Sequence, residues 1–281
     1  MSLLSSLSRR ERGLLSVFAL LTLVAVAGPD LQATELPPAV FADTQAWHGL
    51  PNAMDVLSNL PFLVIGLWGL RWLHWLDRAH EDVLDAVPLP PSMVHPPVNA
   101  LDCAWMFFAG LILTAAGSAF YHLQPDDLRL AADRAGMAVA FAGLVGFAVC
   151  ERVSARAGWP AAWFVLAAGL LAVGVCEETG NMLPWGLVQF GGMALVLTLA
   201  LGRPMHGAVG LRLGWVVFFY ALAKFFEFSD GAIFQATHQL VSGHTLKHLT
   251  AALAGLPVLH ALQAMGRRTL RHNPGAAAVT A

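Results

Sequence analysis

Long apolar runs recur along the whole chain, and they leave few folds open to it. Their approximate positions are residues 13–28, 54–76, 102–122, 132–151, 159–176, 185–202, 210–229 and 243–264. A transmembrane α-helix needs about 20 mostly apolar residues to cross the hydrocarbon core. The runs do not alternate apolar and polar residues as the strands of a membrane barrel do. The sequence therefore predicts an all-α, polytopic membrane protein with eight spans.

Composition supports this class of protein and excludes others. Of the 281 residues, 57% are hydrophobic and only 12% are charged, and the formal net charge is −2. Such a chain has no basic face for nucleic acid, so we expect the bilayer and its lipids as partners and no nucleic acid. No feature of the sequence indicates an obligate protein partner. The three cysteines do not form the spacing pattern of a disulfide framework.

The first apolar run follows a basic segment, SLSRRERG, and resembles a signal peptide. We expect it to be retained, so that residues 1–30 form a transmembrane helix or signal-anchor. Residues 31–265 then form the membrane domain, and residues 266–281 form a cytoplasmic tail.

Arginines indicate the orientation of the spans, because cytoplasmic loops of membrane proteins carry an excess of Lys and Arg. With the N-terminus in the cytoplasm and eight spans, the opposite side keeps only Arg129, Arg134 and Lys247. The cytoplasmic side collects Arg9, Arg10, Arg12, Arg71, Arg78, Arg152, Arg156, Arg203, Arg212, Arg267, Arg268 and Arg271. We therefore expect a multi-pass protein of a bacterial inner membrane with both termini inside.

Costly polar residues gather near the outer ends of three spans, where a functional use is expected. In the stretch GSAFYHLQPDDLRLAADRAG, Ser118 and His122 are four residues apart on one helix face, and Asp133 opens the fourth span. In SGHTLKHLTAAL, His244 and His248 repeat the same spacing at the start of the eighth span. The predicted topology places all five near the outer face, so that the three histidines could meet at one membrane depth.

Three neutral imidazoles are a common ligand set for zinc and leave a fourth position for water, whose pKa the metal lowers to about 7. A carboxylate nearby can relay protons, and a hydroxyl can bond a developing oxyanion. Spacing alone leaves two other interpretations open. The histidines could ligate haem or bond neighbouring helices. In the structural alternative, Ser118 bonds a backbone carbonyl and Asp133 caps a helix.

The segments GSAFYH and HTLKH, with Asp133 eleven residues after His122, resemble the signature of the alkaline ceramidase family. That family belongs to the CREST group of membrane hydrolases and receptors. The resemblance spans roughly residues 40–265, and MDVLSNLPF is similar to the first-helix segment of the family.

This resemblance implies a seven-helix core, to which the N-terminal helix is an addition. It implies zinc held by His122, His244 and His248, with Asp133 transferring protons and Ser118 assisting the metal-bound water and the oxyanion. The implied reaction cleaves the amide of ceramide-like membrane lipids to a sphingoid-type base and a fatty acid. The alternatives are a receptor-like or lipid-sensing member of the group with a structural zinc, and a haem-binding or transport protein.

The family also carries a calcium site in an acidic segment before its first helix. Here FADTQAWHGLPNAMD offers Asp43, Asn52 and Asp55 as candidate calcium ligands, with fewer carboxylates and different spacing. Calcium prefers many oxygen ligands, so this set predicts weaker binding or none. The alternative is that these are solvated loop residues. Further along the chain, we expect Lys224 and Glu227 to form an ion pair, and Asp230 is a candidate for the pocket.

Overall fold

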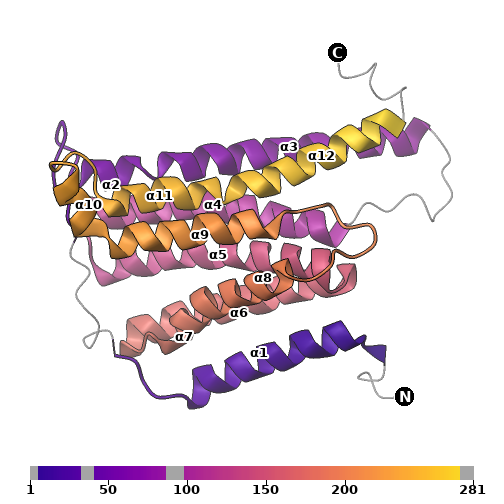
Figure 1. Cartoon of the computed structure of the whole chain (residues 1–281), viewed down its shortest axis with the longest axis horizontal. Helices are drawn as coiled ribbons and strands as arrows, with labels where there is room; N and C mark the ends of the chain where they lie inside the picture. Colours follow the sequence, from indigo (N-terminus) through magenta and orange to yellow (C-terminus); the bar gives the residue numbers. More distant parts are fainter. Residues whose placement is uncertain (1–5, 33–40, 87–97, 273–281) are drawn as a thin grey trace.

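The protein is all-α, as a computed structural model of residues 6–32, 41–86 and 98–272 shows (Figure 1). No β-strand occurs in these residues. Six helical segments are long and apolar enough to cross a membrane, namely residues 53–78, 99–123, 127–152, 155–179, 183–200 and 243–267. The predicted class of integral, multi-pass membrane protein is therefore confirmed.

The described helices follow one another along the chain. They are α1 (Arg9–Ala27), α2 (Ala53–Leu57), α3 (Leu60–Ala86), α4 (Val98–Leu123), α5 (Asp127–Arg152), α6 (Ala155–Thr179), α7 (Leu183–Gly186), the π-helix η4 (Leu187–Gly191), α8 (Gly192–Ala200), α9 (Leu213–Phe228), α10 (Asp230–Ala236), α11 (Gly243–Leu253) and α12 (Gly255–His272). Each predicted span coincides with helix. Two of the eight predicted spans, at α1 and α9, are not among the six segments named above, because their apolar stretches are shorter. Four charged residues open α1, and α9 has 16 residues.

Helices α4 and α5 form the centre of the bundle, and glycines allow them to approach closely. Gly110 and Gly117 lie seven residues apart on α4, and Gly136 and Gly143 lie seven apart on α5. A Cβ at any of the four would come within 2.3–2.7 Å of backbone atoms of the other helix. Small residues at such a repeat are typical of tightly packed membrane helices. This seam brings the outer end of α4 against the start of α5.

The positions of helix boundaries differ from the prediction in two places that affect the site. Helix α5 begins at Asp127 and is capped by Asp126, whose side chain accepts a hydrogen bond from the Arg129 N–H. Asp133 therefore lies six residues, or about 9 Å, inside the helix instead of opening it. The second predicted span is divided into α2 and α3, because the chain turns at Ser58.

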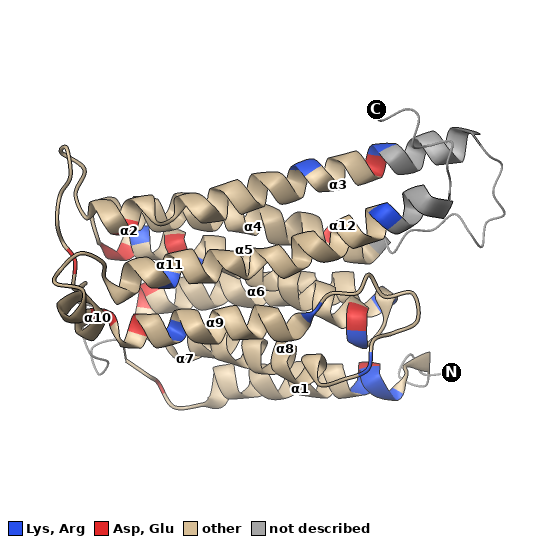
Figure 2. Cartoon of the chain, turned by 45° about the horizontal axis from the view of Figure 1, so that its top comes forward, with Lys and Arg blue, Asp and Glu red and all other residues tan. Residues whose placement is uncertain are grey.

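Charged residues lie mainly toward the two ends of the bundle (Figure 2). At the end where α1 starts, Glu11 forms a double ion pair with Arg156 at 2.7 Å and also accepts a 2.7 Å bond from Ser154. At the same end, the buried Glu151 carboxylate accepts bonds from three successive backbone N–H groups, of residues 209–211, at 2.6–3.1 Å. Charge-assisted bonds of this kind hold the loop between α8 and α9 in place.

Candidate metal centre

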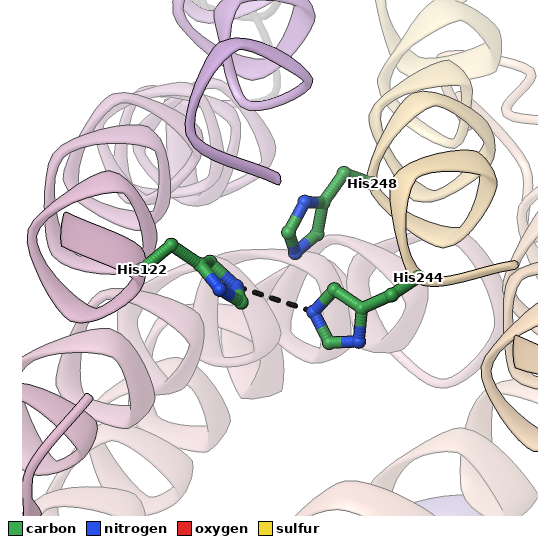
Figure 3. A group of neighbouring side chains, drawn as sticks. All are labelled: His122, His244 and His248. Atoms are coloured by element: carbon green, nitrogen blue, oxygen red, sulfur yellow. Dashed lines mark hydrogen bonds between the residues drawn. The ribbon is translucent and has the colours of Figure 1, made fainter. Parts of the chain in front are cut away.

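Three histidines meet at the opposite end of the bundle (Figure 3). His122 lies on the last turn of α4, and His244 and His248 lie on the first two turns of α11. Only 1%, 8% and 4% of their respective surfaces are exposed. One ring nitrogen from each lies within 4.8 Å of the others, so the three are able to hold one metal ion. The structure thus confirms the prediction, made from the topology, that the three histidines lie together.

A hydrogen bond to Ser58 fixes which nitrogen of His248 faces the centre. The Ser58 hydroxyl donates to the backbone carbonyl of Asp55 at 3.0 Å. Its oxygen lies 2.8 Å from Nδ1 of His248 and therefore accepts from that N–H. Nε2 of His248 is then unprotonated, with its lone pair available to a metal. Metal-bound histidines commonly have such a partner on the second ring nitrogen.

The His122 and His244 rings crowd their Nε2 atoms together. These two atoms are 3.2 Å apart, close to the roughly 3.4 Å between two ligands of a tetrahedral zinc with Zn–N bonds of about 2.0–2.1 Å. Nζ of Lys247 lies 3.1 Å from the same His244 nitrogen, which has a single lone pair. Nδ1 of His122 is buried and has no hydrogen-bond partner within the described ranges of the chain. The donor set thus fits a metal better than it fits a closed network of hydrogen bonds.

Elements before and after the histidines hold their rings in place. Phe41 packs edge-on against the rings of His122 and His244, with ring centroids 4.8 and 4.7 Å apart. Asp230 accepts bonds from the backbone N–H groups of His244, at 2.8 Å, and Ala42, at 2.9 Å. Asp230 therefore anchors the first turn of α11, whose N-cap is Ser242, and is not among the residues that line the cavity.

Ser118 and Asp133 lie beside the histidines. The Ser118 hydroxyl is 3.5 Å from Nε2 of His248 and lies against the Asp133 carboxylate. Within the described residues Ser118 makes no hydrogen bond to a backbone carbonyl, and Asp126 rather than Asp133 caps α5. The structural alternative for these two residues is therefore wrong. Both side chains line the same cavity as the three histidines.

That cavity has a volume of about 320 Å³ and leads away from the histidines toward the middle of the bundle. Its deep walls are apolar and include Phe107, Leu111 and Leu144. Phe107 precedes His122 by fifteen residues on α4, which corresponds to about 22 Å along the helix axis. A cavity of this shape is suited to a hydrocarbon chain whose polar end lies at the histidines.

Three charged residues lie on the same cavity wall. The predicted ion pair is present, with Nζ of Lys224 2.6 Å from Oε2 of Glu227. Nζ of Lys247, from α11, joins it at 3.2 Å from Oε1 of Glu227. Lys247 lies between the two histidines of HTLKH, and its part in the pocket was not predicted. Ser58 was also missed, although the segment MDVLSNLPF indicated it.

Two of the three candidate calcium residues, Asp43 and Asp55, are buried, with 4% and 1% of their surfaces exposed. The interpretation as solvated loop residues is therefore wrong for these two. Asp43 accepts a bond from the Gln45 N–H, and Asp55 accepts one from the Thr245 hydroxyl at 2.9 Å. The Asn52 amide donates to the carbonyl of His122 at 2.7 Å. These bonds support the helices that carry the histidines. Calcium binding stays a prediction.

Fold and site together define a multi-pass, all-α membrane protein with a buried three-histidine cluster able to hold a metal. No protein-family model matches the sequence. The chain is 29% identical over 147 residues to the bifunctional purine biosynthesis protein PurH of Roseobacter denitrificans. This similarity covers 49% of the chain and 27% of that protein, so the chain spans about a quarter of the relative's length. A partial likeness at this level shows no family.

Proposed function

We propose that the protein is a zinc-dependent membrane hydrolase that cleaves the amide of ceramide-like lipids to a sphingoid-type base and a fatty acid. The observation that carries this proposal is the composition of one cavity. Three buried imidazoles, a hydroxyl and a carboxylate lie at its polar end, and an apolar channel lies behind them. The resemblance of the same five residues to the alkaline ceramidase signature supports it.

His122, His244 and His248 would hold the zinc. When bound, zinc polarises a carbonyl and lowers the pKa of a water ligand to about 7. The remaining residues of the cavity have the chemistry that amide cleavage requires. The acyl chain occupies the apolar channel, and the Ser118 hydroxyl donates a hydrogen bond to the carbonyl oxygen of the amide.

Asp133 handles the proton. Its carboxylate accepts a proton from the attacking water and passes it to the amide nitrogen, so that the nitrogen leaves as an amine when the C–N bond breaks. The close approach of α4 and α5 keeps this carboxylate beside Ser118. Ser58 keeps the His248 ring in one orientation throughout.

A lipid-amide panel tests the proposal. Purified protein in detergent is expected to contain about one zinc and to release fatty acid from ceramides, but not from phospholipid esters of the same acyl chain. A chelator should stop the release, and zinc should restore it. Zinc-loaded, folded protein that cleaves no lipid amide would favour the receptor-like alternative. Haem absorbance in the purified protein would favour the haem alternative.

The same proposal places the chain in a bacterial inner membrane, with the arginine-rich end in the cytoplasm and the histidine cluster toward the periplasm. A reporter fused after Arg271 is expected to score as cytoplasmic. His238→Cys, at an exposed position near the histidine cluster, should react with an impermeant thiol reagent once the outer membrane is permeable. His206→Cys, exposed at the other end, is the matched control and should stay unlabelled until the cells are lysed. The reverse pattern would overturn this orientation.

A further inference from the structure

We infer that the preferred substrate is a lipid amide that carries an anionic group close to the amide, a carboxylate or a phosphate. This inference rests on the proposed function and names the substrate class of the same site. A neutral ceramide has no such group. The observations that carry it are the charges along the polar end of the cavity and the partners of each charged side chain.

Cations outnumber carboxylates on the cavity wall. In the part of the chain that the structure describes, Arg134, Lys224 and Lys247 line the cavity with two acidic residues, Asp133 and Glu227. The Asp55 carboxylate does not line the cavity but acts electrostatically on Lys247. A metal at the histidines would add two further positive charges. Uncompensated charge is costly inside a membrane protein, where ionisable groups are normally paired. A neutral substrate would leave this excess in place, whereas an anionic one would reduce it.

The two lysines share a single carboxylate. Glu227 accepts from Nζ of Lys224 at 2.6 Å and from Nζ of Lys247 at 3.2 Å. Lys224 also faces the rings of Phe190 and Tyr220, with Nζ 5.4 and 6.0 Å from the ring centroids. The side chains of Lys224 and Lys247 are only 19% and 20% exposed, so water compensates little of their charge. Asp55 and Asp133 also act electrostatically on Lys247, but among the described residues Glu227 is the only carboxylate that bonds either lysine.

Arg134 has no ion-pair or hydrogen-bond partner among the described residues, although it lines the cavity. Arg129, five residues earlier on the same helix, forms an ion pair with Asp126 and lies over the ring of Phe120. The guanidinium of an arginine binds carboxylates and phosphates through two parallel hydrogen bonds. Among the three cations that line the cavity, Arg134 is therefore the one without a bonded partner in the described residues, and its guanidinium can bind a substrate anion.

The place of Arg134 in the chain limits where the anion lies. Arg134 directly follows Asp133, which lies beside Ser118 at the reacting end of the cavity. Both side chains line the same cavity, so the guanidinium can meet an anion that is bound in the cavity near the amide. This geometry matches an N-acyl amino acid, whose carboxylate is one carbon from the amide nitrogen. It also matches an N-acyl amino alcohol phosphorylated on its hydroxyl.

Three amides that share the same acyl chain but differ in the group beside the amide test which group the site prefers. N-dodecanoylglycine carries the carboxylate, N-dodecanoyl-phosphoethanolamine carries a phosphate, and N-dodecanoylethanolamine is neutral. We expect kcat/KM for at least one anionic amide to exceed that for the neutral amide by about 10-fold or more, since a site that bonds a polar group discriminates against substrates that lack it. The anionic amide with the higher kcat/KM shows whether the site prefers a carboxylate or a phosphate.

A matched pair of variants on α5 assigns the preference to its residue. Arg134→Gln is expected to reduce the ratio of anionic to neutral kcat/KM by about 10-fold or more, whereas Arg129→Gln should leave that ratio within about 2-fold of the parent. The ratio cancels any general loss of folded protein. A parent that cleaves the neutral amide as fast as both anionic ones, or an Arg134→Gln variant with an unchanged ratio, overturns the inference.

Measuring substrate affinity without turnover tests this inference separately from the proposed function. In an Asp133→Asn background, where turnover is expected to be slow, Kd for the anionic amides should be about 10-fold or more below that of the neutral amide. Adding Arg134→Gln should remove the difference. If no amide is hydrolysed but this difference in Kd is present, the proposed reaction fails and the anion site stands. If amides are hydrolysed but Kd does not depend on the anion, the reaction stands and the anion site fails.

Discussion

Asp133→Asn is expected to lower amide hydrolysis by about 10² to 10⁴ while zinc stays bound, because the carboxamide cannot accept a proton and general acid–base assistance has this typical magnitude. The variant keeps the size of the side chain, and the Asp126 cap of α5 is untouched. The measurement is turnover per zinc-loaded, folded molecule. Ser118→Ala, which removes one donor to the carbonyl oxygen, is expected to cost about 10² to 10³.

Asp127→Asn is the matched control, since it makes the same change on the exposed first turn of the same helix. Its turnover should remain within about 2-fold of the parent, as expected for a surface substitution. If Asp133→Asn hydrolyses the lipid amide at nearly the parent rate, Asp133 has no part in proton transfer and the mechanism proposed above is wrong.

Replacing His122, His244 or His248 by Ala, one at a time, is expected to remove most of the bound zinc and with it the hydrolysis. Each substitution leaves two of three imidazoles. Loss of a hydrogen-bond partner of a ligand typically weakens metal binding by about 10- to 100-fold, and loss of a ligand should exceed this. Ser58→Ala, which frees Nδ1 of His248, should therefore fall between the parent and His248→Ala in zinc affinity.

Metal analysis after dialysis against a weak chelator provides the readout, independent of any substrate. His260→Ala is the control, because His260 is exposed on α12, twelve residues beyond His248. It should keep the parent's zinc content. Full zinc content in all three ligand variants would show that the metal, if present, is held elsewhere in the chain.

Much of the fold follows from local patterns in the sequence. A run such as residues 102–122 has enough apolar residues to span a bilayer, and a helix satisfies all of its backbone hydrogen bonds within the segment. Alternation of such runs predicted that His122 and the pair His244 and His248 lie at the same end. Helix periodicity predicted that each four-residue spacing shares one face.

Other features of the site depend on packing between distant segments, which no local pattern records. Helix α5 begins five residues before the predicted span, because the polar stretch before Asp133 is a helix capped by Asp126. The burial of Asp43 and Asp55 depends on how the segment before α2 packs onto α11. Calcium binding by these residues, the zinc and the lipid amide all remain predictions.

The sequence by itself determined the class of this protein and singled out the five residues proposed for the site, because hydropathy and helix periodicity are local properties. Only the tertiary structure decided how those residues are supported and what surrounds them. Ser58 reaches His248 across 190 residues of sequence, and Lys247 reaches Glu227 across 20. That Arg134 lines the cavity without a bonded partner among the described residues likewise became evident only from the structure, because a side chain's partners are set by the helices packed against it.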